Sequence, residues 1–382
     1  MGLLRLLLAL CVVVAHSGAI FGFGLVTGKT ALHSFFVISG FYMALILNEK
    51  YIGQNNSYKL FISNRLLRLY PIYWVIAICT IVFSVVMYLV TGNDFGPLQP
   101  YVEYFDSMNF GTIFFLIFTN IIIFLQDIVM FLGLDTITGG LFFTKDFRQT
   151  DPALYNFLLV PQAWTVGLEL IFYLIAPFIV RRKIKFIVIL LFISLAIRIV
   201  FYVNGYQKDP WAFRFFPSEI FFFLLGTLSY HMYKKMKSLN IKTSTLKLVY
   251  VFILVFSLFY SFIPYIGSFP TYPHFPLKSM IYIFCIFLSI PFIFILSKKW
   301  KRDRYIGELS YPVYLSHILI LNLIRWVDIP LFNNYTSIFL SIFSIIFSIV
   351  LTELVTNKIE GYRQRRVKVV KKNIIITKNI IH

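Results

Sequence analysis

Residues 181–204 read RRKIKFIVILLFISLAIRIVFYVN, in which a basic cluster precedes a long apolar run. A run of about 20 apolar residues is what an α-helix needs to cross the hydrocarbon core of a bilayer. Similar runs recur near residues 3–25, 31–48, 69–90, 112–134, 161–180, 186–204, 215–233, 248–266, 278–297, 307–325 and 336–357. Only helices and closed barrels span membranes, and barrel strands lack such long runs. The pattern therefore predicts an all-α polytopic membrane protein.

The composition agrees with this fold class. Of the 382 residues, 59% are hydrophobic and only 13% are charged, whereas soluble domains have charged residues near a quarter of their composition. The net charge is +19, which in a soluble protein would indicate nucleic-acid binding. Here the charges cluster between apolar runs, so we interpret them as positive-inside topology and expect no nucleic-acid partner. The three Cys residues lie within apolar runs and read as buried free thiols.

The basic clusters predict which side of the membrane each gap faces. They lie within residues 50–68, 181–185, 234–247, 298–304 and 358–372. All five are placed on the cytoplasmic side, because Lys and Arg are enriched in cytoplasmic loops.

This placement requires an even number of crossings between the first two clusters, but three apolar runs separate them. The run at 112–134 is the weakest, because Asn120, Gln126 and Asp127 interrupt it. We expect it to be re-entrant or interfacial on the outer face. About ten transmembrane helices remain, with both termini cytoplasmic. Residues 1–357 would form a single membrane domain and residues 358–382 a basic cytoplasmic tail.

Ionisable residues within the spans are functional candidates, since burying them in a bilayer is costly. His16 follows Arg5 by eleven residues, roughly 16 Å along a helix, which places His16 in the outer half of its span. There it could act as a general base or simply hydrogen-bond a neighbouring helix. Glu169 is expected at a similar depth and could orient the His16 imidazole.

Other candidates carry weaker signals. Arg65 and Arg68 share one helix face and could clamp a phosphate, although such pairs also serve as ordinary positive-inside anchors. Ser39 and Gly40 lie in the middle of a span, where small residues favour close packing, and Ser39 could also be a nucleophile.

One late segment repeats polar and aromatic residues every three positions. Tyr311, Tyr314 and His317 share a helix face and could line a cavity or pack within the bundle. The sequence contains no HExxH, CxxC, Walker or GxGxxG motif, so no metal, ATP or dinucleotide is expected.

Together these pieces resemble the membrane acyltransferase 3 family, whose motifs occur here in order over most of the chain. They are Arg5 and His16 with ten residues between them, FFVISGF at 35–41, RLLR at 65–68, WTVGLELIFYL at 164–174 and GELSYPVYLSHIL at 307–319. Thr165 and Gly167 depart from the commoner residues of the fourth motif.

The resemblance implies an enzyme of the bacterial cytoplasmic (inner) membrane. It would transfer an acyl group, usually acetyl, from cytoplasmic acyl-CoA to a hydroxyl of an extracytoplasmic glycan or lipid-linked saccharide. The implied catalytic residues are His16, Glu169 and Tyr173. Acetyl-CoA binding would fall to Arg5, Arg65, Arg68, Ser39 and Gly40, and the substrate pocket to Trp164, Tyr311, Tyr314 and His317.

Two other classes fit a multi-span basic protein. A transporter or flippase for a lipid-linked sugar would be expected to show broken spans in matching halves, which the sequence lacks. A polysaccharide polymerase would be expected to carry a large basic outer loop, whereas residues 91–160 hold seven acidic residues against Lys145 and Arg148. The sequence does not specify the acyl group or whether the protein forms a homo-oligomer. It also does not decide between direct transfer and a covalent acyl-enzyme intermediate.

Overall fold

The computed structural model describes residues 1–51, 57–206, 208–269 and 272–367 and is dominated by helices. Seven helical stretches are long and apolar enough to cross a membrane. Four of them are single helices: α2 Gly28–Glu49, α3 Ser57–Thr91, α7 Ile184–Val203 and α10 Leu277–Ser297. The other three extend beyond one helix. Pro161–Ile179 includes α6 Trp164–Ile179, Thr243–Phe262 includes α9 Thr243–Phe259, and Thr336–Val367 begins with α13 Thr336–Leu351. The chain is therefore an integral, all-α membrane protein, as the sequence predicts.

Three further helices coincide with the remaining predicted crossings. They are α1 Gly2–Ser17, α8 Phe216–Met236 and α11 Lys301–Val327. The first is short, and the other two carry more polar residues than a typical span. Ten of the eleven apolar runs thus lie largely within helices of 16 or more residues, while the number that cross a bilayer stays a prediction.

The run at 112–134 behaves differently from the others, as its polar interruptions suggest. Its helix, α5, spans Phe110–Ile121, about 18 Å, which is too short to cross the hydrocarbon core. Asn120 ends it by using its side chain elsewhere: Nδ2 donates to the Phe157 carbonyl at 2.9 Å, and Oδ1 accepts from the Leu159 amide at 2.8 Å. The chain then continues as a 3-10 helix and a strand.

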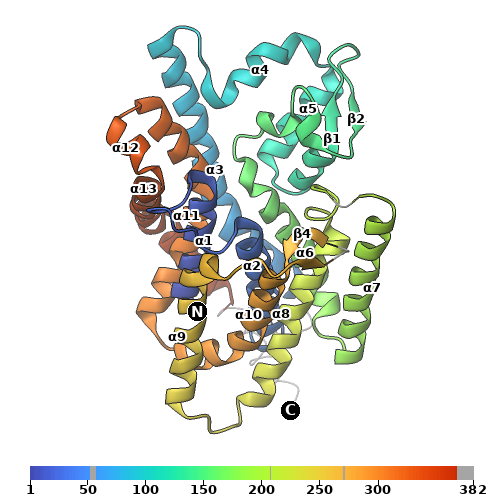
Figure 1. Cartoon of the computed structure of the whole chain (residues 1–382), viewed down its shortest axis with the longest axis vertical. Coiled ribbons are helices and arrows are strands. Elements are labelled where there is room, and N and C mark those ends of the chain that lie inside the picture. The colour runs from blue at the N-terminus through green and yellow to red at the C-terminus, as the bar shows by residue number, and fades with distance from the viewer. Residues whose placement is uncertain (52–56, 207, 270–271, 368–382) are drawn as a thin grey trace, which may run out of the picture.

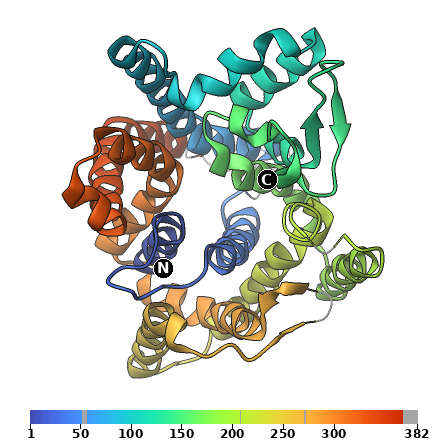
Figure 2. The same cartoon turned by 45° about the horizontal axis from the view of Figure 1, so that its top comes forward.

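The helices pack around a central pair (Figure 2). α1 and α2 lie in the middle, with α11 and α13 on one side and α8, α9 and α10 on another. α2 and α8 approach closely because each has a glycine at the crossing. A Cβ on Gly40 would lie 1.9 Å from the Phe223 carbonyl oxygen, and one on Gly226 would lie 1.9 Å from that of Val37. Small residues at a helix crossing are typical of membrane bundles.

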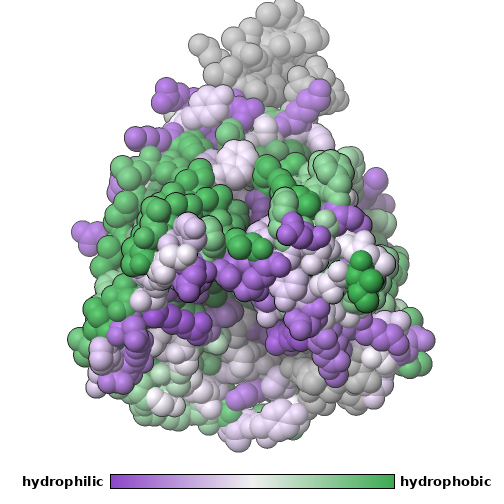
Figure 3. Space-filling model, turned by 90° about the horizontal axis from the view of Figure 1, so that it is seen from above, coloured by the Kyte–Doolittle hydropathy of each residue, from purple (hydrophilic) through white to green (hydrophobic). Residues whose placement is uncertain are grey.

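Short elements cover the end of the molecule that is uppermost in Figure 1. They include α4 Gln99–Tyr104, α12 Pro330–Asn334, the antiparallel pair β1 Leu132–Leu134 and β2 Leu141–Phe143, and the 3-10 helices Gly96–Leu98, Phe105–Ser107, Gln126–Phe131, Phe147–Gln149 and Leu154–Phe157. A second pair, β3 Ser268–Phe269 and β4 Tyr272–Pro276, precedes α10. Seen from above, hydrophilic residues gather around a hollow in the middle of the face (Figure 3).

The chain does not leave the bundle after α13. A π-helical turn at Thr352–Thr356 follows directly, and the helix then continues to residue 367. π-turns within helices are often found at functional sites. This last stretch, residues 357–367, is called the C-terminal helix below, and it contributes to the cavity that follows.

Candidate functional site

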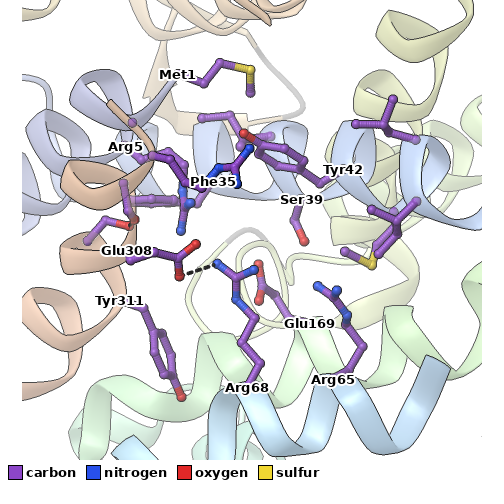
Figure 4. Close-up of a pocket in the computed structure, with 18 of the residues that line it drawn as sticks. Met1, Arg5, Phe35, Ser39, Tyr42, Arg65, Arg68, Glu169, Glu308 and Tyr311 are labelled. Carbon is purple, nitrogen blue, oxygen red and sulfur yellow. Dashed lines mark hydrogen bonds and ion pairs between the residues drawn. The ribbon is translucent and has the colours of Figure 1, made fainter. Parts of the chain in front are cut away.

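A cavity of about 540 Å³ lies among α1, α2, α3, α6, α11 and the C-terminal helix (Figure 4). Its size is within the range of small-molecule sites. Eight of the residues that sequence analysis selected line it, namely Arg5, Ser39, Arg65, Arg68, Glu169, Tyr173, Tyr311 and Tyr314. Residues from all five motifs of the sequence thus meet at one place.

One wall of the cavity is basic. Arg65 and Arg68 project from α3 in the same direction, as their i, i+3 spacing predicts (Figure 4). Arg68 NH2 lies 3.1 Å from Glu308 Oε2 on α11. Arg65 is 7% exposed, and its Nε has no hydrogen-bond partner among the described residues. An anion entering this cavity would meet guanidinium groups with unused hydrogen-bonding capacity.

Glu169 lies beside the arginines (Figure 4), and with Tyr173 and Ser39 it forms a hydrogen-bonded chain of three polar side chains from two helices. The Tyr173 hydroxyl donates to Glu169 Oε2 at 2.8 Å, one turn earlier on α6. The same hydroxyl lies 3.4 Å from Ser39 Oγ on α2. Glu169 is therefore held by Tyr173.

The cavity reaches Tyr314 and Thr165 at its deeper end. The Tyr314 hydroxyl lies 2.8 Å from Thr165 Oγ1 and 2.8 Å from the Gln162 carbonyl oxygen. Tyr311 also lines the cavity and fixes α11 to α3 by donating to the Leu69 carbonyl at 2.9 Å. These contacts hold α3, α6 and α11 around the deep end of the cavity.

His16 and His317 lie beside each other, but neither lines the cavity. Their ring centroids are 4.9 Å apart; His317 is buried and His16 is exposed. His16 Nδ1 lies 2.9 Å from the Val12 carbonyl, and His317 Nδ1 lies 2.6 Å from that of Tyr314. A carbonyl only accepts, so each Nδ1 carries a proton, and in the neutral tautomer that these contacts select Nε2 is the acceptor.

The structure corrects one expectation, namely that Glu169 contacts His16. Within the described part of the chain, no hydrogen bond or ion pair joins them, and Glu169 is satisfied by Tyr173. Equal depth within a span does not specify which helices are neighbours. The aromatic neighbour of the His16 ring is His317, which sequence analysis had placed in the substrate pocket.

Two other selected residues also lie away from the cavity lining. Gly40 faces α8 at the close crossing described above, so its role is helix packing. Trp164 lies under the Arg214 guanidinium, 4.0 Å from the ring centroid, in a cation–π contact. Arg214 in turn pairs with Asp209 at 2.6 Å.

Sequence analysis missed several lining residues. Glu308 belongs to the late motif GELSYPVYLSHIL, and its place one helical turn before Tyr311 could have indicated that it lines the same cavity. Arg363 looked like part of a basic tail, and nothing in the sequence indicated that the helix returns to the cavity. Among the described residues, no group of three or more His, Cys, Asp or Glu could hold a metal ion.

Comparisons with known proteins agree with the motifs. A family model described as an acyltransferase domain matches residues 1–353. The chain is 27% identical, over 208 residues, to an uncharacterized protein of Aquifex aeolicus (strain VF5); the matched region covers 53% of this chain and 89% of that protein. No solved structure matches this chain.

Proposed function

The chain belongs to the acyltransferase 3 family of membrane acyltransferases, and from that membership we propose the donor, acceptor and mechanism that follow. The donor is acyl-CoA, with acetyl-CoA as the simplest case, reached from the cytoplasm. The acceptor is a hydroxyl of a glycan or lipid-linked saccharide outside the bacterial cytoplasmic membrane. The observation that carries this proposal is that a basic cavity and a pair of histidines lie in one helical bundle, separated along α1.

The cavity suits the donor. Arg5, Arg65 and Arg68 line it and provide cationic groups for the phosphates of CoA. Beyond them, Ser39, Tyr173 and Tyr314 offer hydroxyl groups along the path of the thioester arm. In this arrangement the single Tyr173 hydroxyl proton, donated to Glu169 before the donor binds, turns to the carbonyl oxygen that becomes negative during attack.

His16 suits the acceptor. Arg5 and His16 stand on one face of the bundle's central helix, roughly 16 Å apart. His16 Nε2 accepts the proton of the sugar hydroxyl, and the oxygen forms a bond to the thioester carbonyl carbon. The carbon–sulfur bond then breaks, and the proton on His16 passes to the departing CoA sulfur. No net proton is gained or lost.

Tyr314 connects the two depths. Its hydroxyl lines the donor cavity, and its backbone carbonyl accepts from His317 Nδ1 at 2.6 Å. His317 thereby places its unprotonated Nε2 near His16. We propose that the two rings share the incoming hydroxyl proton, with His16 as the general base because it is the exposed member.

The test compares acyl transfer by cells carrying wild-type protein, His16→Ala, or His231→Ala as a matched histidine control in α8. Mass spectrometry of surface glycans should show a gain of one acyl group with wild type and His231→Ala, and none with His16→Ala. Full acylation in His16→Ala cells would reject the mechanism. Unchanged acylation after deletion of the gene would reject the function. Ser39→Ala, if inactive with a normal amount of protein, would favour an acyl-enzyme at Ser39.

A further inference from the structure

The C-terminal helix forms part of the donor cavity, although it lies beyond residue 353, where the family match ends. Three of its residues line the cavity: Glu360, Arg363 and Gln364. Nothing in the family match assigns a role to this segment, so its presence at the cavity requires a separate explanation.

Polar contacts fix this helix to the entrance of the bundle. Arg366 donates from NH1 to Asn64 Oδ1 at 3.0 Å and from NH2 to Ser63 Oγ at 2.9 Å, both near the start of α3. On the other side, Lys50 Nζ donates to Gln364 Oε1 at 3.0 Å. These contacts join the C-terminal helix to the end of α2 and to the turn of α3 that carries Arg65 and Arg68.

Arg363 is buried in a way that favours a bound anion. It is 6% exposed, and NH1 contacts Glu360. Its Nε has no hydrogen-bond partner among the described residues, as is also true of Arg65 Nε. The positive charges of Arg65 and Arg68 both act on Arg363. Three guanidinium groups gathered in a buried place repel one another unless anions compensate them.

Carboxylates compensate only part of this charge. Glu308 pairs with Arg68, and Glu360 pairs with Arg363. A phosphate carries more charge and more acceptor oxygens than a carboxylate, and it can accept from several guanidinium groups at once. The site therefore matches a phosphate-bearing ligand better than a neutral or monocarboxylate one.

We propose that the C-terminal helix is a wall of the donor site, in which Arg363, together with Arg65 and Arg68, binds a phosphate group of the CoA donor. The inference rests on the proposed function, since it assumes that donor. Glu308 and Glu360 hold the guanidinium groups in position and give way as the phosphate oxygens take over their hydrogen bonds. Arg366, Gln364 and Lys50 position the helix without touching the phosphate.

The experiment uses the full chain in nanodiscs of phosphatidylcholine, so that no anionic lipid headgroup competes. Arg363→Gln is compared with Arg365→Gln, which changes the same residue type at an exposed position of the same helix. Binding of CoA is measured by calorimetry. Steady-state transfer to the surface glycan identified in the mass-spectrometry test is measured with two donors. One is acetyl-CoA, and the other is acetyl-pantetheine, which has the same thioester arm but no phosphate.

For Arg363→Gln we expect CoA to bind at least tenfold more weakly, which corresponds to loss of one charge-assisted contact. KM for acetyl-CoA should rise by a similar factor, with kcat little changed. Transfer from acetyl-pantetheine should be the same as for wild type, and Arg365→Gln should match wild type in every assay.

Three results would decide against this inference. Equal CoA affinity in Arg363→Gln and Arg365→Gln, with wild-type transfer intact, would reject the role of Arg363 alone. Loss of transfer from both acetyl-CoA and acetyl-pantetheine would assign Arg363 a structural role and also overturn the inference. A wild-type protein that neither binds CoA nor transfers acetyl would reject the proposed function, and the inference with it.

Discussion

Glu219 shows how a single residue can stabilise the interior of this bundle. It is fully buried on α8, with His33 Nε2 2.9 Å from Oε2 and Arg198 NH2 2.8 Å from Oε1. The His33 ring also stacks on Phe222 at 3.9 Å between centroids. One carboxylate therefore joins α2, α7 and α8.

Replacing Glu219 should destabilise the protein strongly. Glu219→Ala leaves the Arg198 guanidinium buried without its carboxylate, which costs about 3–5 kcal/mol. The thermal midpoint of the purified protein should fall well below that of wild type. Glu103→Ala, at an exposed carboxylate, serves as the control and should shift the midpoint little. Equal midpoints for the two variants would contradict this account of the Glu219 cluster.

Asp127 predicts a pH dependence of stability. It is a buried carboxyl in the 3-10 helix after α5, and burial raises its pKa to about 7 against an ordinary value of 3.8. Between these two values the folded protein binds the proton and the unfolded chain has lost it. The contribution of Asp127 to stability is thus fully present below about pH 4, declines as pH rises to about 7, and changes little once both states have lost the proton.

The measurement is the thermal midpoint of wild type and of Asp127→Asn from pH 5 to pH 9. Asparagine keeps the shape but does not titrate, so the decline from pH 5 to about pH 7 should be shallower in the variant, and the variant should be the more stable protein at pH 9. Parallel curves across the whole range would show that Asp127 does not titrate in the folded protein.

At the scale of elements, the close contact of α2 and α8 depends on the glycines at their crossing. A Cβ added at Gly40 would meet the Phe223 carbonyl at 1.9 Å, and a helix backbone cannot yield that much without separating the two helices. Gly40→Ala should therefore destabilise the protein by about 1–3 kcal/mol, as overpacking does.

The matched variant is Gly361→Ala. Gly361 is also helical, but an added Cβ there would have no atom within 4 Å. Alanine should be neutral there or stabilise the helix slightly. The two thermal midpoints should therefore move apart, and a Gly40→Ala protein as stable as the Gly361→Ala protein would refute the packing argument.

The existence of the helices was predictable because the length of each apolar run can be read directly from consecutive residues of the sequence. The interruption at Asn120 marked a run whose helix, α5, is too short to span, since a polar side chain in an apolar run must find partners outside the helix. The helix that continues to residue 367 was not predictable in the same way. Its Arg-rich sequence reads as an exposed tail, whereas long-range contacts with Lys50, Ser63 and Asn64 hold it at the bundle.

The candidate site was predictable in its residues but only partly in its contacts. Spacing placed Arg65 and Arg68 on one face, and in the structure both line a cavity with Arg5 and Glu169. The pairing of His16 with Glu169 was wrong, because span depth says nothing about which helix is the neighbour. The contact of His16 with His317 depends on the packing of α1 against α11, 300 residues apart in the chain.

At the scale of the whole molecule, the sidedness of the cavity decides whether the chemistry can work. The cationic residues at the cavity include Lys50, Lys298, Arg304 and Arg363, all members of the clusters predicted to face the cytoplasm. Acyl-CoA would then enter from the side where it is made, and His16 would stand toward the opposite side. This arrangement requires residues 91–160 outside and residues 234–247 inside.

Cysteine labelling of intact cells tests this requirement directly. In a background without the three native cysteines, Lys145→Cys and Lys237→Cys each introduce one exposed thiol, in the two segments predicted to lie on opposite sides. A membrane-impermeant maleimide should label Lys145→Cys in intact cells, and Lys237→Cys only after permeabilisation. The reverse pattern would place the arginines outside, away from cytoplasmic CoA. Labelling of both in intact cells would mean an even number of crossings between them, and the ten-helix topology would then be wrong.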